Sequence, residues 1–425
     1  MNNSLKKRLL SAAMAAVMVF SLLPATAWAA MAENLPAASG QTRTEQKRGG
    51  SDTYTVTRDV KSVAAAQTGA VKKVVCLDLT TGEDQVSLDA SGGYRWVAGA
   101  NYLYLYKVHI EAEGSNALVL PAGATVEVVG KCSITGGGAN ECAVWSKGDV
   151  TVGLGQDAAL TVNGLGWRAE GNLTVAHAYD AYTGGELTVN YNGTSSDNGT
   201  SGAAIYMGGN TLYVEQGARV TANGSGIGNV KAKDSCGVKG AVYVDGGAEL
   251  AADGGSAGST GISYGIFGSV TVKNGTVTAN GGRGLQSYGV SGDSVSVSDG
   301  GVLNANGGTA VQDLNSGIKP ISGGIYLGNN AVIENAAVNA SGGVAPCGDS
   351  FASVGLQMTS RSEVTVNSGG VLNANGGQLT NGSSANEANG FSAGINMMGA
   401  GAANLFVNGT GRVTAIGNPE RLDGG

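Results

Sequence analysis

The sequence predicts an all-β protein: a parallel β-helix (solenoid) of about nine to ten rungs with an N-terminal β cap. Two observations predict this fold. The phrase GGVLNANGG begins at Gly300 and again at Gly369, and looser copies of it recur every 26 to 41 residues. Each copy is too short to bury its own apolar face. A repeat of this length therefore indicates a solenoid, in which stacked neighbours bury a continuous core.

Apolar and polar residues alternate strictly inside each copy. An alternation with period two is typical of a strand that buries one face. An Asn-Gly or Asp-Gly pair often follows, and because these residues accept a positive φ, it predicts a turn. The segment around Val126 and Val128 is predicted as an earlier copy. The last core-facing residues of the nine copies are Val162, Val189, Ala222, Ala252, Ala279, Ala305, Ala340, Ala374 and Ala415.

Two further short strands precede each copy. The first carries a small residue and then an apolar one, at Ile205, Val238, Ile266, Val290, Ile325, Leu356 and Ile395. The second ends at Val214, Val244, Val272, Val297, Ile333, Val366 and Val407. Three strands and three turns make one rung, and rungs stack about 4.8 Å apart. A β-sandwich and a propeller are alternatives, but neither explains why the first strand keeps its signature in every repeat.

The chain divides into four predicted segments. Residues 1–29 combine a basic start, an apolar run and the small-x-small site Ala27-Trp28-Ala29, which predicts a signal peptide cleaved after Ala29. Residues 30–50 are predicted as a flexible linker, 51–117 as the N-terminal cap and first strands, and 118–425 as the parallel β-helix. No later stretch is apolar over the 18 or more residues that a spanning helix needs. We therefore expect a secreted or cell-surface protein with no transmembrane segment after cleavage.

Composition limits the partners. Charged residues make up 13 % of the chain and the net charge is −7, which argues against nucleic acid because its binding requires basic surface. The five cysteines are odd in number and irregularly spaced. Buried free thiols are the favoured interpretation, and a Cys132–Cys142 bridge is the alternative.

The segment GYRWV…YLYLYKVHIEAEGSNALVLPAGATVEVVG, followed by units such as YGIFGSVTVKNGTVTANGG, resembles a known group. It is similar to secreted bacterial right-handed parallel β-helix proteins of the pectate-lyase-like superfamily. Within that superfamily it is most similar to surface proteins described as carbohydrate-binding-domain-containing or adhesin-like. The resemblance covers roughly residues 75–425. It implies a right-handed helix that binds acidic or plant-type polysaccharide, in some members with calcium, but no residue here matches a calcium-ligand motif.

One column of residues is the candidate binding site. The position after the first strand's apolar residue faces outward, and aromatic rings there would stack on sugar rings while polar neighbours bond hydroxyls. The alternative is ordinary scattered surface aromatics. The predicted ligand-binding residues are Trp145, Glu170, Tyr206, Phe267 and Tyr326. Rung by rung the predicted column reads Trp145, Glu170, Tyr206, Lys239, Phe267, Ser291, Tyr326, Gln357 and Asn396.

Catalysis is the competing hypothesis. Only His109 and His177 are present, so a histidine-based centre is hard to build. Glu215 and Asp245 are predicted on adjacent rungs, with carboxyls close enough for sugar hydrolysis, although Lys273 follows in the same column. We therefore expect a non-catalytic protein that recognises polysaccharide along the rod, with no metal residue and no cofactor other than calcium. The alternatives are a polysaccharide lyase or glycoside hydrolase, and a structural stalk or adhesin that binds host protein or a host surface glycoprotein.

Overall fold

The computed structural model describes residues 41–46, 53–58, 72–138, 141–179, 183–193, 202–225, 234–258, 260–312, 318–346, 351–380, 390–397, 403–418 and 421–422. It divides into two compact units, Met1–Val71 with Leu88–Gly92, and Lys72–Ser87 with Gly93–Gly425. The predicted signal peptide lies outside the described residues. In the first unit, β1 (Gln41–Gln46) pairs antiparallel with β2 (Thr53–Arg58). Strand β1 falls inside residues 30–50, the segment predicted as a linker.

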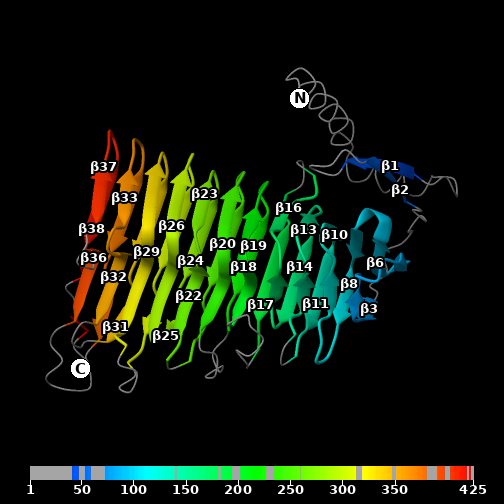
Figure 1. The fold of residues 1–425 in the computed structure, drawn as a ribbon, viewed down its shortest axis with the longest axis horizontal. Helices are drawn as coiled ribbons and strands as arrows, with labels where there is room; N and C mark the ends of the chain where they lie inside the picture. The colour runs from blue at the N-terminus through cyan, green and yellow to red at the C-terminus, as the bar shows by residue number, and fades with distance from the viewer. Residues whose placement is uncertain are drawn as a thin grey trace. The chain divides into compact units, whose positions relative to one another are not determined.

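The second unit is a parallel β-helix, whose strands lie side by side from β3 to β38 in Figure 1. All nine predicted copies of the repeated phrase are strands of one twelve-stranded parallel sheet. The two identical copies form β27 and β34, and β30 lies between them. The strands of this sheet are β3 (Lys72–Val75), β8 (Val108–Glu111), β11 (Lys131–Gly136), β14 (Ala159–Gly164), β17 (Glu186–Tyr191), β19 (Arg219–Asn223), β21 (Glu249–Asp253), β24 (Thr276–Asn280), β27 (Val302–Asn306), β30 (Ala337–Ser341), β34 (Val371–Asn375) and β38 (Arg412–Ile416).

The twelve strands exceed the nine or ten predicted rungs, because three early members were not recognised. Strands β3, β8 and β11 lack the Asn-Gly ending of the later copies. The segment around Val126 and Val128 was wrongly assigned to this sheet. It forms β10 (Ala124–Val129), which pairs with β7 (Tyr102–Tyr106) and β13 (Val150–Leu154) in a different sheet. Parallel pairing therefore begins within residues 51–117, the range predicted as cap and first strands.

That second sheet has twenty strands and holds both of the other predicted strand types. In β18, β20, β26 and β29 the first and second strands run on as one strand rather than two. Its members besides β7, β10 and β13 are β4 (Leu77–Asp78), β5 (Gln85–Asp89), β6 (Gly92–Val97), β9 (Leu118–Leu120), β12 (Val144–Ser146), β15 (Trp167–Ala169), β16 (Leu173–His177), β18 (Ala203–Val214), β20 (Ser235–Asp245), β22 (Ile262–Phe267), β23 (Val270–Lys273), β26 (Gln286–Ser298), β29 (Ile321–Glu334), β32 (Ala352–Met358), β33 (Glu363–Val366), β36 (Phe391–Met397) and β37 (Asn404–Val407).

A third, five-stranded sheet was not predicted. Its strands have two or three residues each, too few to show an alternation in the sequence. The first four follow the glycine pairs that end the repeated phrase, and all five stack in parallel like the longer strands. The members are β25 (Arg283–Gly284), β28 (Thr309–Ala310), β31 (Val344–Pro346), β35 (Gln378–Thr380) and β39 (Arg421–Leu422).

The glycines after the repeated asparagines are required for close packing, which corrects the prediction of positive-φ turns. Gly281 and Gly307 do not adopt a positive φ. A Cβ at Gly281 would lie 2.4 Å from Ser287 Oγ, and one at Gly307 would lie 2.5 Å from Ser322 Oγ. These glycines leave room for a column of buried serines at the corner of the helix.

The buried serines connect successive rungs. Ser322 Oγ donates to the carbonyl of Gly308 over 2.7 Å, and it accepts the N–H of Gly343 on the next rung over 2.8 Å. Buried polar backbone groups are costly unless they are bonded, so each serine satisfies two of them. The column comprises the buried Ser263, Ser287, Ser322 and Ser353 and the half-buried Ser392.

At the N-terminal end of this unit, β6 pairs antiparallel with β7 and Trp96 is buried beneath it. A single 3₁₀ turn, Ala98–Ala100, follows β6. Among the described residues, no helix is long and apolar enough to cross a membrane.

Candidate functional site

The register of the parallel strands aligns the residues that follow the first strand's apolar residue into one column, which we call the outer column. Ser291 and Gln357 in this column are buried, although the sequence predicts that the column faces outward. Lys239 lies between Tyr206 and Phe267, and Ser291 lies between Phe267 and Tyr326. The structure thus brings Trp145, Tyr206, Phe267 and Tyr326 into one line, as the repeat alignment predicted. The complete column is Trp145, Arg168, Tyr206, Lys239, Phe267, Ser291, Tyr326, Gln357 and Asn396.

Glu170 does not belong to the outer column. Trp145 pairs with Arg168, and Arg168 pairs with Tyr206, so the arginine takes the predicted place of the glutamate. Glu170 lies two residues further on, where its carboxylate is 3.6 Å from the Arg168 guanidinium. The alignment was wrong because it took Ala169 as the inward apolar residue of this rung. The buried residue that pairs with Val144 is Trp167, which follows Gly166, and Arg168 comes directly after it. The correction puts a cation, rather than an acid, between two aromatic rings.

Trp145 is contacted by cations on two sides. The Lys147 ammonium lies 4.8 Å from the centre of the Trp145 ring, and the Arg168 guanidinium lies 5.7 Å from it. Cations within about 6 Å of an aromatic centroid are attracted to the electron-rich face of the ring. The Trp145 Nε1 atom is buried and has no hydrogen-bond partner among the described residues.

Lys239 repeats this arrangement between the next two rings. Its ammonium lies 5.7 Å from the centre of Tyr206 and 5.8 Å from the centre of Phe267. Rings and cations therefore alternate over five successive rungs, with rings two rungs (about 9.6 Å) apart. Of the column's rings, Phe267 has the most open side chain, with 41 % of its surface exposed.

Two buried tyrosines, Tyr264 and Tyr288, support the rings from one side. Tyr264 packs against Phe267 with centroids 4.8 Å apart, and Tyr288 packs against Tyr326 at 5.5 Å. Tyr264 and Tyr288 stack on each other with their planes 18° apart. The sequence analysis missed both residues, although they stand at one position of the repeat, three before Phe267 and Ser291. They belong to a buried cluster with Ala203, Cys236, Ile321, Ala352 and Val354, against which Tyr206 and Tyr326 pack.

Burial of this cluster has electrostatic consequences. Desolvation raises the pKa of the Tyr264 and Tyr288 hydroxyls, because a buried phenolate is less stable than a buried phenol. The ring of Tyr288 lies over Gly323, where a Cβ would come within 2.7 Å of it. The rings near Tyr326 are thus fixed by packing, which makes the surface that they present rigid.

Asp245, one member of the candidate acidic pair, accepts two hydrogen bonds. One Asp245 carboxylate oxygen accepts the Tyr243 hydroxyl over 3.1 Å, and the other accepts the Gly246 N–H over 2.6 Å. Lys273 follows Asp245 in the same column and also lies 3.9 Å from Asp299. The pair fits a surface charge ladder better than a general acid with its nucleophile.

The two histidines occupy different settings. His177 is the last residue of β16 and is buried, and its Nε2 accepts the N–H of Gly185 over 3.3 Å. His109 Nδ1 lies 2.7 Å from Ser133 Oγ, and its Nε2 lies 3.5 Å from Glu111. This resembles a nucleophile–base–acid series. However, β11 pairs with β8 on one edge and β14 on the other, so the backbone N–H groups around Ser133 are engaged in the ladder and do not form an oxyanion hole.

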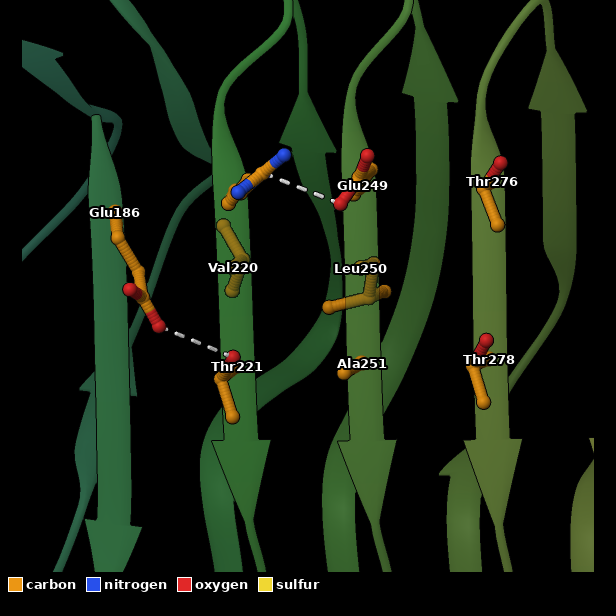
Figure 2. Close-up of a pocket in the computed structure, with 9 residues that line it drawn as sticks. Glu186, Val220, Thr221, Glu249, Leu250, Ala251, Thr276 and Thr278 are labelled. Atoms are coloured by element: carbon orange, nitrogen blue, oxygen red, sulfur yellow. Dashed lines mark hydrogen bonds and ion pairs between the residues drawn. The ribbon is translucent and has the colours of Figure 1, made fainter. Parts of the chain in front are cut away.

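A shallow hollow of about 220 Å³ lies on the twelve-stranded sheet. Figure 2 shows why it forms: Ala251 stands between Thr221 and Thr278 and leaves a gap in a row of larger side chains. Arg219 is 3.2 Å from Glu249 beside it, and Thr221 donates to Glu186 over 3.5 Å. No aromatic ring lines this hollow, so it lacks the means to stack on a sugar.

The described cysteines are all free thiols. Cys132, Cys142 and Cys236 are buried, as the favoured interpretation predicted, and the alternative Cys132–Cys142 bridge is absent. Cys76 is exposed, which the sequence did not predict, and Cys347 lies outside the described residues. Burial raises the pKa of Cys142 and of Cys236 to about 12. Within the described ranges, no three His, Cys, Asp or Glu side chains gather in a way that would hold a metal ion.

Comparisons with protein-family models, with curated proteins and with solved structures gave no match. The function is therefore inferred from the sequence and the geometry of this chain.

Proposed function

We propose that this protein is a secreted or surface-associated, non-catalytic binding protein that recognises polysaccharide along the outer column. One observation carries the proposal: aromatic rings and cations alternate in line over the five rungs from Trp145 to Phe267. Rings supply flat apolar surface for the faces of pyranose rings, and the cations between them bond hydroxyl or anionic groups.

The straightness of the column favours a polymer over a small sugar. An extended glycan advances by about one pyranose unit per rung, so successive sugars would meet successive side chains. The rings lie two rungs apart, about 9.6 Å, which suits a chain that presents the same face at every second sugar. Contacts of this kind are weak one at a time and add along the polymer, so affinity should rise with chain length.

The cations also bear on the choice of polymer. Lys147, Arg168 and Lys239 lie on or beside the column, although the chain as a whole carries a net charge of −7. A local positive stripe on an acidic protein attracts anionic groups at short range. Polysaccharides that carry carboxylate or sulfate groups are therefore the preferred ligands of the proposal.

The secreted location in the proposal rests on the first 29 residues, whose basic start, apolar run and small-x-small site are typical of a signal peptide. It also agrees with the resemblance to secreted β-helix proteins, which remains part of the proposal.

The test is a binding assay of the purified protein against plant, mucin and bacterial polysaccharides, with calcium and with a chelator. The same samples are assayed for new reducing ends and for unsaturated products. The proposal predicts binding without products. Products that disappear in Glu215→Gln or Asp245→Asn would establish an enzyme instead. Failure to bind any glycan would favour a stalk or an adhesin for host protein.

A further inference from the structure

The cations of the outer column stand on alternate rungs. Arg168 lies between Trp145 and Tyr206. Two rungs further on, Lys239 lies between Tyr206 and Phe267. We call the five column residues from Trp145 to Phe267 the charged segment. Its order is ring, cation, ring, cation, ring, so the two cations are about 9.6 Å apart along the β-helix.

The charged segment has defined limits within the column. Before Trp145 the column continues through the buried Val119 to the carboxylate of Asp78. After Phe267 it continues through the buried Ser291, and the later positions are uncharged. An anionic group on a ligand in the column therefore has two cations to meet, and both belong to the charged segment.

Both cations are placed to meet a ligand. Arg168 and Lys239 are half-buried, and a charge-assisted hydrogen bond is stronger in partly desolvated surroundings than in bulk water. The Glu170 carboxylate lies 3.6 Å from the Arg168 guanidinium, which has several N–H donors and so keeps some for a ligand. The Lys239 ammonium lies between two rings, 5.7 Å and 5.8 Å from their centres. Lys147 lies beside the column, with its ammonium over the Trp145 ring. A ligand that lies along the charged segment therefore meets a column cation at every second rung.

We propose that the charged segment selects a polysaccharide with a two-sugar repeat, in which one sugar carries a carboxylate or sulfate and the other is neutral. The inference rests on the proposed function and specifies the ligand class of the same site. An extended glycan advances by about one sugar per rung, so the neutral sugars stack on the rings. The anionic groups of the alternate sugars then bond Arg168 and Lys239.

Two other classes of polysaccharide match the charged segment less well. A neutral polymer leaves both cations without an anionic partner. A polymer with an anion on every sugar brings carboxylates over Tyr206 and Phe267 as well. The face of an aromatic ring displaces water from such a carboxylate and donates no hydrogen bond to it, which is costly for a charged group. The spacing of the cations therefore distinguishes an alternating acidic polymer from a polyuronate.

The test compares six-sugar oligosaccharides that differ in the pattern of their charges. Hyaluronan and unsulfated chondroitin hexasaccharides carry a carboxylate on every second sugar, hexagalacturonate carries one on every sugar, and chitohexaose carries none. Titration calorimetry should show at least one alternating hexasaccharide bound about fivefold more tightly than hexagalacturonate and chitohexaose. The inference is overturned if hexagalacturonate or chitohexaose binds equally well or better, or if neither alternating hexasaccharide binds.

A second measurement separates this failure from failure of the proposed function. Tyr206→Ala with Phe267→Ala removes two rings of the charged segment. If hexagalacturonate binds best and this double variant lowers its affinity, the outer column binds polysaccharide but does not select an alternating one. If no polysaccharide binds, or if the folded double variant keeps its full affinity, the proposed function itself fails.

A single variant tests the spacing of the cations. Phe267 is 41 % exposed, so Phe267→Lys should fold, and it places a cation on the rung next to Lys239. The affinity for hexagalacturonate, relative to that for the better alternating hexasaccharide, should rise about two- to fivefold. Thr271→Lys is the control, because it adds the same charge to the same rung outside the column, and it should leave this ratio unchanged.

Two results with these variants contradict the inference. One is a constant ratio in Phe267→Lys, and the other is an equal rise in Thr271→Lys, which would attribute the effect to net charge alone. If Phe267→Lys does not fold, the comparison of the hexasaccharides with the unaltered protein still decides the question.

Discussion

The hydroxyl of Ser353 donates to the carbonyl of Gly343 over 2.8 Å, inside the corner of the β-helix. The same oxygen accepts the N–H of Gly377 from the following rung over 2.9 Å. Ser353 thus joins two rungs through buried backbone groups that water does not reach. This column of serines explains why the sequence keeps a serine before the small-then-apolar signature in rung after rung.

Replacing that serine should destabilise the fold without touching the outer column. Ser353→Ala leaves a buried carbonyl and a buried N–H unsatisfied, and we expect the free energy of unfolding to fall by about 1–3 kcal/mol. Urea denaturation followed by circular dichroism measures it. Ser360→Ala, at an exposed position, is the control and should change little. Equal stability of the two variants would contradict the role given to the serine column.

Lys239 should contribute to charge selectivity. Its ammonium lies between two rings at the outer surface, so Lys239→Gln removes the charge and keeps much of the side-chain length. We expect affinity for an anionic polysaccharide to fall about two- to fivefold, as for a single exposed charge pair. Its dependence on salt should weaken as well. Affinity for a neutral polysaccharide should not change. Titration calorimetry at two salt concentrations measures the affinities of Lys239→Gln and of the unaltered protein for both polysaccharides. Lys273→Gln, which lies outside the outer column, is the control. An equal loss of affinity in that variant would contradict the role proposed for Lys239.

Two rings of the column should differ in their effect on stability. Tyr326 packs against the buried tyrosine cluster, whereas Phe267 is 41 % exposed. Tyr326→Ala should therefore lower the free energy of unfolding by about 1–3 kcal/mol, and Phe267→Ala by less. Thermal denaturation of both variants measures the difference. If Phe267→Ala were the more damaging change, the packing described for the cluster would be wrong.

Alkaline pH should destabilise the protein through Tyr264 and Tyr288. Burial raises the pKa of both hydroxyls above the value in the unfolded chain, which is about 10. Their contribution to stability is complete below that pH. Above it, the unfolded state releases protons that the folded state retains, so stability falls as pH rises towards the folded-state pKa.

Tyrosinate absorbance and circular dichroism, recorded together against pH, test this expectation. The buried tyrosines should ionise only as the fold is lost, and Tyr288→Phe should reduce the slope of stability against pH. Ionisation of every tyrosine near pH 10 (about the unperturbed value) with the fold intact would refute it.

Thiol reactivity should follow burial. Cys76 is exposed, whereas Cys132, Cys142 and Cys236 are buried, and burial holds the pKa of Cys142 and Cys236 near 12. The thiolate is the reactive form, so iodoacetamide at neutral pH should alkylate Cys76 well before these three. Mass spectrometry of the digested protein identifies the labelled peptides. Early labelling of Cys236 in folded protein would show that its cluster opens to solvent.

The repeat could be predicted from the sequence because it follows two simple patterns. Strict alternation placed Val277 and Ala279 on the buried face, and recurrence aligned them with Leu303 and Ala305 on the next rung. The outer column followed from the same alignment wherever the small-then-apolar signature was present. It failed at Glu170, because Ala169 was taken as the apolar residue of the signature in place of the buried Trp167.

Other features depend on contacts that no local pattern records. The role of Gly281 became visible only when Ser287 was placed against it. The support that Tyr264 and Tyr288 give to Phe267 and Tyr326 arises from side chains of neighbouring rungs. The early strands β3, β8 and β11 do not end in Asn-Gly, so an alignment based on that ending did not detect them.

The most direct test of the proposed function compares two double variants in their affinity for the polysaccharide that the unaltered protein binds most tightly. Tyr206→Ala with Phe267→Ala removes two rings from the outer column. Tyr213→Ala with Tyr243→Ala removes two rings that contact each other on the second strand of the rungs, away from the column. Titration calorimetry should show affinity lowered at least about tenfold, equivalent to about 1.4 kcal/mol, by the first pair and nearly unchanged by the second. Unchanged affinity in the first pair, with its fold intact, would contradict binding along the outer column.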